Sequence, residues 1–448
     1  MFPRINTRVL YTALSFILII LGTVAAIQYA KGRYRISPQG FVQGTGLLSA
    51  NSFPTGAEVM IDGKLVTATD DTLYLQPGNY EVEISKDGYT PWKKTLTIEP
   101  ELVAQTNALL FPVAPSLSTL TFTGIQNTSP SPDGRKILYY TASQSAQRKN
   151  GLYVMELGND TPISFQNGPR QIAEDIDSLN FEEAQFIWSP DSSEVMVITE
   201  TKEFLLPVDR KSDIASLLDI SFQKQQILRE WEQEMYLRER QFLREFPAEV
   251  IQIATESAKN VYISPDKKRL LYTATAAVTI PDTIVPPVPA TNTQPEERNL
   301  QPGTIYVYDR EEDKNFRLAQ ETVDTSAPFK TLLAHDLYNV TPVSLTASAS
   351  AFETLQASTS AQTAANFNRY HTSLYTETLQ WFPDSKHFLF VQDNAIKIVE
   401  YDGTNVVSLY SGPFEKNFIY PWPDGSRLVI STKFSLDAPL NLYAIELE

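Results

Sequence analysis

Few residues of this chain belong to the types that perform chemistry, and their spacing favours structural roles. The 448 residues include no cysteine, which leaves no thiolate nucleophile, no disulfide and no cysteine-ligated zinc. Only three histidines occur, His335, His371 and His387, and none lies four residues from another as in a histidine zinc helix. The sequence also lacks a glycine-rich phosphate loop and a nucleophile elbow. We therefore predict no catalytic residue, no cofactor and no metal.

The most regular candidate ligands are five aspartates that each follow a proline. They are Asp133, Asp191, Asp266, Asp384 and Asp424. One carboxylate in each of several separate repeats cannot supply the six or so oxygen ligands that calcium needs. An aspartate after a proline fits a tight turn, in which its side chain accepts hydrogen bonds from nearby backbone N–H groups. We interpret these residues as the structural turns of a repeat.

Each Pro-Asp pair opens a repeat in which an apolar, strand-forming run follows the turn. The copies are SPDGRKILYY at Ser131, SPDSSEVMVI at Ser189, SPDKKRLLYT at Ser264, FPDSKHFLFV at Phe382 and WPDGSRLVIS at Trp422. A second apolar strand follows each copy after a variable gap, for example over residues 304–309. Self-similarity at this scale indicates a repeat architecture. Four-stranded units arranged radially make the blades of a propeller.

The repeat resembles the TolB-like (PD40-type) propeller repeat, whose signature is a Ser-Pro-Asp-Gly turn followed by an Ile-Tyr-Val-type strand. The glycine is kept only at Gly134 and Gly425. The resemblance implies a β-propeller over residues 116–448, and we predict five or six blades within an all-β fold class. The chain ends at residue 448 after a third strand, so we expect residues 117–122 to supply the missing outer strand and close the ring.

A smaller β module precedes the propeller, over residues 45–112. Asp62-Gly63 and Pro77-Gly78 are turn signals, and residues 80–84 alternate strictly between apolar and polar. Short strands at this spacing predict a small antiparallel sandwich. Four motifs resemble the PEGA domain: FPTGA at Phe53, IDG at Ile61, LQPGNY at Leu75 and KDGY at Lys86. The resemblance implies a non-catalytic module of envelope or surface proteins, with a suspected role in attachment to cell-wall polysaccharide.

Three aromatic residues of this module have two interpretations. Tyr80, Tyr89 and Trp92 could form a platform on which a sugar stacks, or they could be core residues of a sandwich that needs every large side chain it has. Exposed, coplanar rings would favour the platform. The core interpretation carries the greater weight.

Three insertions interrupt the propeller. Residues 211–257 place Leu228, Trp231, Met235 and Phe242 on one face of a predicted helix, which Pro247 ends or kinks. The other face is predicted to carry charged residues that include Glu232, and Glu234 and Arg238 form a favourable pair four residues apart. Trp231 and Met235 could contact a partner from a projecting arm, or the helix could pack on the propeller flank. Residues 276–303 are rich in proline and residues 341–373 in serine, threonine and alanine, so both are expected to be loops.

The N-terminal segment predicts attachment to a membrane. Residues 9–30 carry no charge and are long enough to span a bilayer as a helix. We expect a single-pass signal anchor after a short cytoplasmic segment, residues 1–8, and before a linker, residues 31–44, with the C-terminal body extracytoplasmic at the cell surface. A cleaved signal peptide is the alternative, because Val24-Ala25-Ala26 could be a cleavage site.

Charge and composition narrow the classes of partner. The net charge is −16, although residues 1–40 carry five basic residues and no acidic one. The remainder of the chain is therefore strongly acidic, and a protein surface of that charge repels nucleic acid. Together with the two family resemblances, which imply a protein of the bacterial cell envelope, the sequence favours a non-enzymatic, membrane-anchored scaffold that binds a protein through its propeller. Binding of cell-wall polysaccharide through the smaller module is the first alternative, and a propeller hydrolase or lyase is the second.

Overall fold

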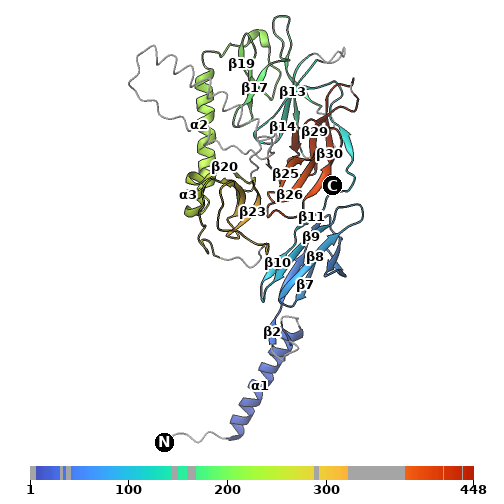
Figure 1. Cartoon of the computed structure of the whole chain (residues 1–448), viewed down its shortest axis with the longest axis vertical. Coiled ribbons are helices and arrows are strands. Elements are labelled where there is room, and N and C mark those ends of the chain that lie inside the picture. Colours follow the sequence, from blue (N-terminus) through green and yellow to red (C-terminus); the bar gives the residue numbers. More distant parts are fainter. Residues whose placement is uncertain are drawn as a thin grey trace, which may run out of the picture. The chain divides into compact units, whose positions relative to one another are not determined.

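The structure, a computed structural model, describes residues 7–30, 34–36, 42–142, 150–158, 168–286, 292–320, 379–416, 418–435 and 437–448. The chain divides into two compact units (Figure 1). The first unit comprises Met1–Leu110 with Pro287–Pro295, and the second comprises Phe111–Pro286 with Glu296–Glu448. Strands dominate both units, so the all-β class is confirmed.

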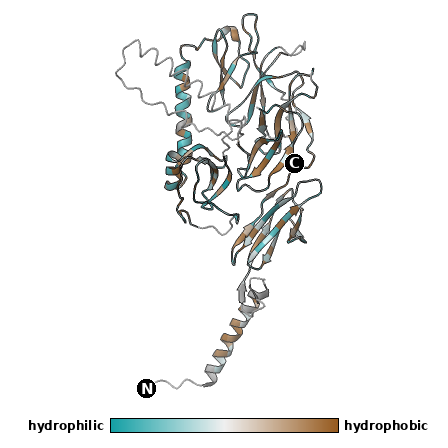
Figure 2. Ribbon diagram, viewed as in Figure 1, coloured by the Kyte–Doolittle hydropathy of each residue, from teal (hydrophilic) through white to brown (hydrophobic). Residues whose placement is uncertain are grey.

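A helix, α1 (Thr7–Ala30), begins the described part of the chain. Figure 2 shows apolar residues along the middle of α1, and the side chains of Phe16 and Ile19 are 65% and 66% exposed. Among the described residues, no helix combines the length and the apolarity needed to cross a membrane. The span over residues 9–30 therefore stays a prediction. Two short strands, β1 (Tyr34–Ile36) and β2 (Val42–Gly44), pair antiparallel after α1.

The first unit then forms its sheets from nine strands. These are β3 (Gly46–Ala50), β4 (Ser52–Phe53), β5 (Glu58–Ile61), β6 (Lys64–Ala68), β7 (Asp71–Leu75), β8 (Gly78–Ser85), β9 (Trp92–Ile98), β10 (Val103–Gln105) and β11 (Ala108–Leu109). The largest sheet has the order β6-β5-β8-β9 and is antiparallel throughout. A second sheet has the order β10-β3-β7, and β11 pairs with β4.

A single apolar core joins these sheets. Leu48 of β3, Val59 of β5, Val82 of β8 and Leu96 of β9 are all buried in it. The predicted sandwich is therefore present, but the prediction that it is antiparallel throughout was wrong. β10 pairs with β3 and β11 with β4 in parallel, because the chain returns along both strands in their own direction after β9.

The second unit consists of small antiparallel sheets that follow one another along the chain. Sheet 1 comprises β13 (Gln126–Pro130), β14 (Lys136–Thr141), β15 (Gly151–Glu156) and β16 (Arg170–Glu174), and sheet 2 comprises β17 (Gln185–Trp188), β18 (Glu194–Ile198) and β19 (Glu203–Pro207). Sheet 3 comprises β20 (Ala258–Ile263), β21 (Arg269–Ala274), β22 (Thr304–Asp309) and β23 (Lys314–Gln320), and sheet 4 comprises β24 (Gln380–Trp381), β25 (His387–Gln392), β26 (Ala395–Glu400) and β27 (Val407–Tyr410). Sheet 5 comprises β28 (Ile419–Pro421), β29 (Arg427–Thr432), β30 (Asn441–Glu446) and β12 (Leu117–Thr119).

The ring closes as expected. β12, which precedes sheet 1 in the chain, pairs antiparallel with β30 as the outer strand of sheet 5. Ser118 Oγ also donates to Glu446 Oε1 at 2.9 Å. The predicted closing strand is thus confirmed, although it is shorter than residues 117–122. The predicted count of five or six blades stays a prediction, because residues 321–378 lie outside the described part.

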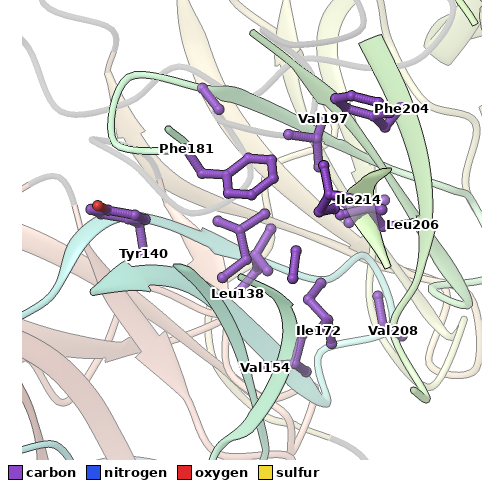
Figure 3. Packing of buried hydrophobic residues seen from close by; sticks show 14 of the residues in the cluster. Leu138, Tyr140, Val154, Ile172, Phe181, Val197, Phe204, Leu206, Val208 and Ile214 are labelled. Carbon is purple, nitrogen blue, oxygen red and sulfur yellow. The ribbon is translucent and has the colours of Figure 1, made fainter. Parts of the chain in front are cut away.

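Apolar cores lie between successive sheets. Leu138 and Val154 of sheet 1 belong to one cluster with Trp188 and Phe204 of sheet 2. Figure 3 shows part of this cluster, in which side chains such as Leu138 of sheet 1 and Val197 of sheet 2 face one another. Sheet 5 shares a core with sheet 1, and sheet 3 shares one with sheet 4. At the junction of sheets 4 and 5, a Cβ at Gly425 would lie 3.1 Å from the Phe382 ring, and the φ of 80° there also favours glycine. Small sheets that follow one another along the chain and share apolar cores between their faces are the arrangement of β-propeller blades.

The predicted helical insertion contains two helices. After a short 3₁₀ turn over residues 214–216, the insertion forms α2 (Lys224–Leu243) and α3 (Ala248–Glu256). The predicted break at Pro247 is confirmed, because α2 ends before it and Pro247 occupies the N-cap position of α3. Leu228 and Met235 of α2 pack on Ile187 and Met196 of sheet 2, and Trp231 lies against the same cluster. The flank-packing interpretation is therefore confirmed. The Ser/Thr/Ala-rich loop over residues 341–373 lies outside the described residues.

Candidate binding cavity at the Pro-Asp turns

The Pro-Asp turns share one local geometry. In the first, Asp133 Oδ1 accepts hydrogen bonds from Ser131 Oγ at 2.6 Å and from the backbone N–H of Arg135 at 3.0 Å. The residue after each aspartate has left-handed backbone torsions. The φ angles are 77° at Gly134, 59° at Ser192, 64° at Lys267, 60° at Ser385 and 80° at Gly425. The aspartates therefore serve their own turns, and the repeat tolerates other residues where glycine is the least strained choice.

Two of these non-glycine residues connect neighbouring sheets. Ser192 Oγ accepts from the backbone N–H of Asp133 at 3.1 Å, and its carbonyl accepts from Lys136 Nζ at 3.0 Å. Ser385 repeats both contacts one pair of sheets later, with the backbone N–H of Asp266 and the Arg269 guanidinium, each at 3.0 Å. Serine lacks the conformational freedom of glycine, but at these two positions its hydroxyl accepts a hydrogen bond from the backbone of the preceding turn.

The turns surround a cavity of about 610 Å³. Residues from all five Pro-Asp turns line it together with one face of α2. The lining residues are Pro132, Asp133, Gly134, Arg135, Pro190, Met235, Arg238, Glu239, Phe242, Tyr262, Ile263, Ser264, Pro265, Lys267, Gln380, Trp381, Pro383, Tyr420, Pro421 and Pro423. The volume falls in the range of about 300–1,000 Å³ that is typical of ligand sites.

Helix α2 forms one wall of this cavity and is held there by polar contacts. Arg238 donates from Nη1 to the Pro190 carbonyl at 2.9 Å and from Nη2 to Glu234 at 2.7 Å, so the predicted Glu234–Arg238 pair is confirmed. Lys267 Nζ lies 3.9 Å from the centroid of the Phe242 ring, a cation–π contact. The Lys267 side chain thus bridges the turn of sheet 3 and the C-terminal end of α2.

The cavity is more basic than the protein around it. Three cationic side chains, Arg135, Arg238 and Lys267, line it against the carboxylates of Asp133 and Glu239, in a chain whose net charge is −16. Burial, together with the nearby Glu239 carboxylate, raises the pKa of Tyr262 to about 12, so its hydroxyl stays a neutral donor at physiological pH. An apolar ligand surface that carries a negative charge matches this lining.

A buried carboxyl group lies on α2, where the sequence analysis placed only exposed charge. Glu232 is four residues after Leu228 and three before Met235, so it lies on the packing face of the helix and is only 8% exposed. Burial raises the pKa of its carboxyl to about 7, although Arg229 opposes the shift. The assignment of Glu232 to the outer face was therefore wrong. Its spacing from the apolar residues was the available signal.

The described histidine does not form part of the cavity. His387 is 4% exposed and its Nδ1 lies 2.6 Å from Asp384 Oδ2, while Phe111 and Phe382 pack against the ring edge-on. Burial alone would raise the pKa of the Asp384 carboxyl, but His387 and two backbone N–H groups hold it below its usual value. In the described part of the chain, no three His, Cys, Asp or Glu residues form a group able to hold a metal. His335 and His371 lie outside the described residues.

The aromatic residues that were candidates for sugar stacking lie against the core of the first unit. Trp92 is 3% exposed, and Tyr80 and Tyr89 are partly buried against the same cluster. This placement favours the core interpretation. Of the two candidates on the insertion, Met235 lines the cavity and Trp231 packs on sheet 2. The cavity itself was not predicted, because it depends on which turns converge in space.

Comparison with known protein families supports the assignment of the smaller module. Residues 45–112 match the PEGA domain family model. No curated protein matches the chain in sequence.

Similar solved structures include two TolB proteins. That from Agrobacterium tumefaciens is 13% identical over 74% of this chain and 83% of its own, with a TM-score of 0.21. That from Acinetobacter baumannii is 12% identical over 82% and 60%, with a TM-score of 0.20. The AfRom2 CNH domain is 10% identical over 74% and 100%, with a TM-score of 0.25. Scores this low carry no argument, and the propeller assignment rests on the strand pairing and the sheet junctions.

Proposed function

We propose that this chain is a non-enzymatic binding protein of the cell envelope that engages a protein partner through the cavity at its Pro-Asp turns. The observation that carries the proposal is the convergence of all five turns and α2 on one cavity of about 610 Å³. Its proline-rich, partly basic lining fits an extended segment of polypeptide that presents apolar side chains beside a carboxylate. Convergent polar groups within an apolar cavity are the usual form of a binding site.

The remaining features fit a binding role better than catalysis. His387, the one histidine among the described residues, is buried beside Asp384 and away from the cavity lining. Residues 45–112 match the PEGA domain family, and the resemblance implies a non-catalytic module. The carbohydrate alternative has less support, because Trp92 is buried in the core.

Attachment to a membrane is part of the proposal. The exposed apolar side chains of α1, including Phe16 and Ile19, need a lipid or protein environment to cover them. We propose that this segment holds the chain at the cell membrane with its C-terminal body outside the cytoplasm. Extraction of membranes with alkaline carbonate tests this point. The chain should stay in the membrane pellet, and a variant that lacks residues 9–30 should be released; equal release of both would refute the anchor.

Site-specific photocrosslinking in cells tests the cavity. A benzophenone amino acid replaces Arg135 or Glu239, which both line the cavity, and replaces Lys202 as a matched control on an exposed turn of sheet 2. We expect the same protein adduct from both cavity positions and none from Lys202. Adding Arg238→Glu should weaken the adduct from position 135. Absence of an adduct at the cavity positions, or an equal adduct at Lys202, would overturn the proposal.

A further inference from the structure

The two edges of the four-stranded sheet in the first unit differ in how they avoid further strand pairing. β6 forms one edge, and its register with β5 shifts between Val59 and Met60, which indicates a bulge. Bulges and charged residues such as Lys64 blunt an edge. β9 forms the opposite edge and pairs with β8 without interruption over seven residues, from Trp92 to Ile98. A regular edge of this length is a ready template for another strand.

A distant segment of the chain occupies the β9 edge. Thr293 Oγ1 accepts a hydrogen bond from the backbone N–H of Thr97 at 3.0 Å, and Gln294 Nε2 donates to the backbone carbonyl of Thr95 at 2.9 Å. Thr95 and Thr97 are two residues apart, so these groups lie on the same side of the strand. Residues 287–295 belong to the first unit, although they are inserted between β21 and β22 of the second.

The local chemistry of residues 292–295 favours a turn that covers the β9 edge. Asn292 Oδ1 accepts from the backbone N–H of Gln294 at 3.0 Å, which bends the chain into a turn. Pro295 follows and has no N–H to give to a ladder. Within residues 292–295, the side chains of Thr293 and Gln294 therefore satisfy the edge N–H of Thr97 and the edge carbonyl of Thr95.

The β9 edge is complementary to itself. In an antiparallel pair centred on Thr95, Trp92 faces Ile98, Lys93 faces Thr97 and Lys94 faces Leu96, so no two lysines are opposed. Residues 92, 94, 96 and 98 are buried and residues 93 and 95 are exposed, so this register continues the buried face of the sheet across the pair. A twofold axis brings the same surface of two copies together in this way.

We propose that residues 292–295 guard the β9 edge against pairing with the β9 edge of a second copy of this chain. The occupant that the guard excludes is thus another molecule of the same protein. The inference is independent of the cavity in the second unit. It assigns the proline-rich insertion a role that its composition did not indicate.

The natural absence of cysteine provides a sharp test. A Thr95→Cys variant of the full chain in detergent has a single thiol, so a disulfide between two copies forms where residue 95 of one copy meets residue 95 of the other, as it does in the proposed pair. With residues 292–295 intact, we expect monomers on a non-reducing gel. Adding Thr293→Val and Gln294→Ala should convert them to disulfide-linked dimers. Lys64→Cys on the blunted β6 edge is the matched control and should stay monomeric in both backgrounds.

Amide exchange distinguishes the possible failures. In Thr293→Val without any cysteine, the Thr97 amide should exchange about tenfold faster, the factor that about 1.4 kcal/mol represents. Thr279→Val, which breaks a 2.9 Å side-chain bond to Asn299 elsewhere in the insertion, should leave Thr97 unchanged. Unchanged exchange in Thr293→Val refutes the guard itself. Faster exchange without dimers refutes self-pairing, and so do dimers that survive Thr97→Pro, which removes the edge N–H.

Discussion

Sheets 1 and 2 of the propeller meet directly, whereas α2 lies between the turns of sheets 2 and 3. At the direct junction, Trp188 is completely buried and its Nε1 lies 3.3 Å from the Ser129 carbonyl of sheet 1. At the other junction, α2 packs on sheet 2 through Leu228 and reaches sheet 3 through the contact between Phe242 and Lys267. The same repeat thus forms an apolar junction between sheets 1 and 2 and a charged, helix-bridged junction between sheets 2 and 3.

The difference shows where the propeller can tolerate change. A direct junction relies on close packing of buried side chains, in which a cavity is costly. The helix-bridged junction relies on fewer buried residues and on the ion pair between Lys224 of α2 and Glu203 of sheet 2, and its helix forms one wall of the cavity. Binding sites need exposed polar groups, so a junction that is not fully packed is the natural place for one.

The largest expected effect comes from removing the tryptophan of the direct junction. Trp188→Ala leaves a cavity in the core between sheets 1 and 2 and should destabilise the second unit by about 3–5 kcal/mol. Trp231→Ala on the half-buried face of α2 should cost about 1 kcal/mol. Calorimetric unfolding of both variants measures the contrast. Equal losses would mean that the two junctions are packed alike.

The pH dependence of the helix-bridged junction should follow Glu232. Burial raises the pKa of this carboxyl to about 7, so the folded state binds more protons than the unfolded state between its ordinary value and about 7. Stability should therefore be greatest below that window, fall as pH rises through it, and level off above it. Glu232→Gln should remove this fall.

Denaturant unfolding at pH 5 and pH 8 compares the two proteins. Glu230→Gln is the matched control, because Glu230 is exposed on the same helix. A fall in stability that persists in Glu232→Gln would assign the pH dependence to another group. A fall that disappears in Glu230→Gln as well would point to the overall charge of α2.

A smaller effect should follow from Ser192→Ala at the direct junction. The substitution keeps a Cβ at the left-handed position, so the backbone strain is unchanged, but the N–H of Asp133 loses its acceptor. We expect a loss of about 1–2 kcal/mol, and the same from Ser385→Ala between sheets 3 and 4. Ser193→Ala, whose hydroxyl bonds only the exposed Asp191, should change stability little. A neutral Ser192→Ala would show that the bond between turns is dispensable.

The parts that could be predicted from the sequence are those that local chemistry decides. The Pro-Asp turns, the strands after them and the end of the helix before Pro247 all follow from turn and helix rules that act over a few residues. The closing strand β12 was predictable because the repeat left one strand without a blade. The sites depend on contacts far apart in the chain, such as Thr97 with Thr293, or Asp133 with Ser192.

Glu232 shows why the helix face was misread. Charged residues are exposed far more often than buried, and that expectation outweighed the spacing of Glu232 from Leu228 and Met235. The parallel pairing of β10 with β3 was missed for a different reason. Short strands with turn signals favour antiparallel neighbours, and nothing in a three-residue strand specifies the direction of its partner.

The smallest expected change in stability is at Lys267, where backbone strain and a cation–π contact have opposite effects on the free energy of unfolding. Variants that separate these two contributions test how the helix-bridged junction differs from the direct one. Its left-handed φ of 64° costs roughly 1–2 kcal/mol for a residue with a Cβ, while its ammonium over the Phe242 ring returns about 0.5–1 kcal/mol. Lys267→Gly removes both terms and should leave stability nearly unchanged. Lys267→Ala keeps the strain and loses the contact, so it should be the less stable variant. If Lys267→Gly and Lys267→Ala lose the same stability, backbone strain at this position does not contribute, and the helix-bridged junction depends on the cation–π contact alone.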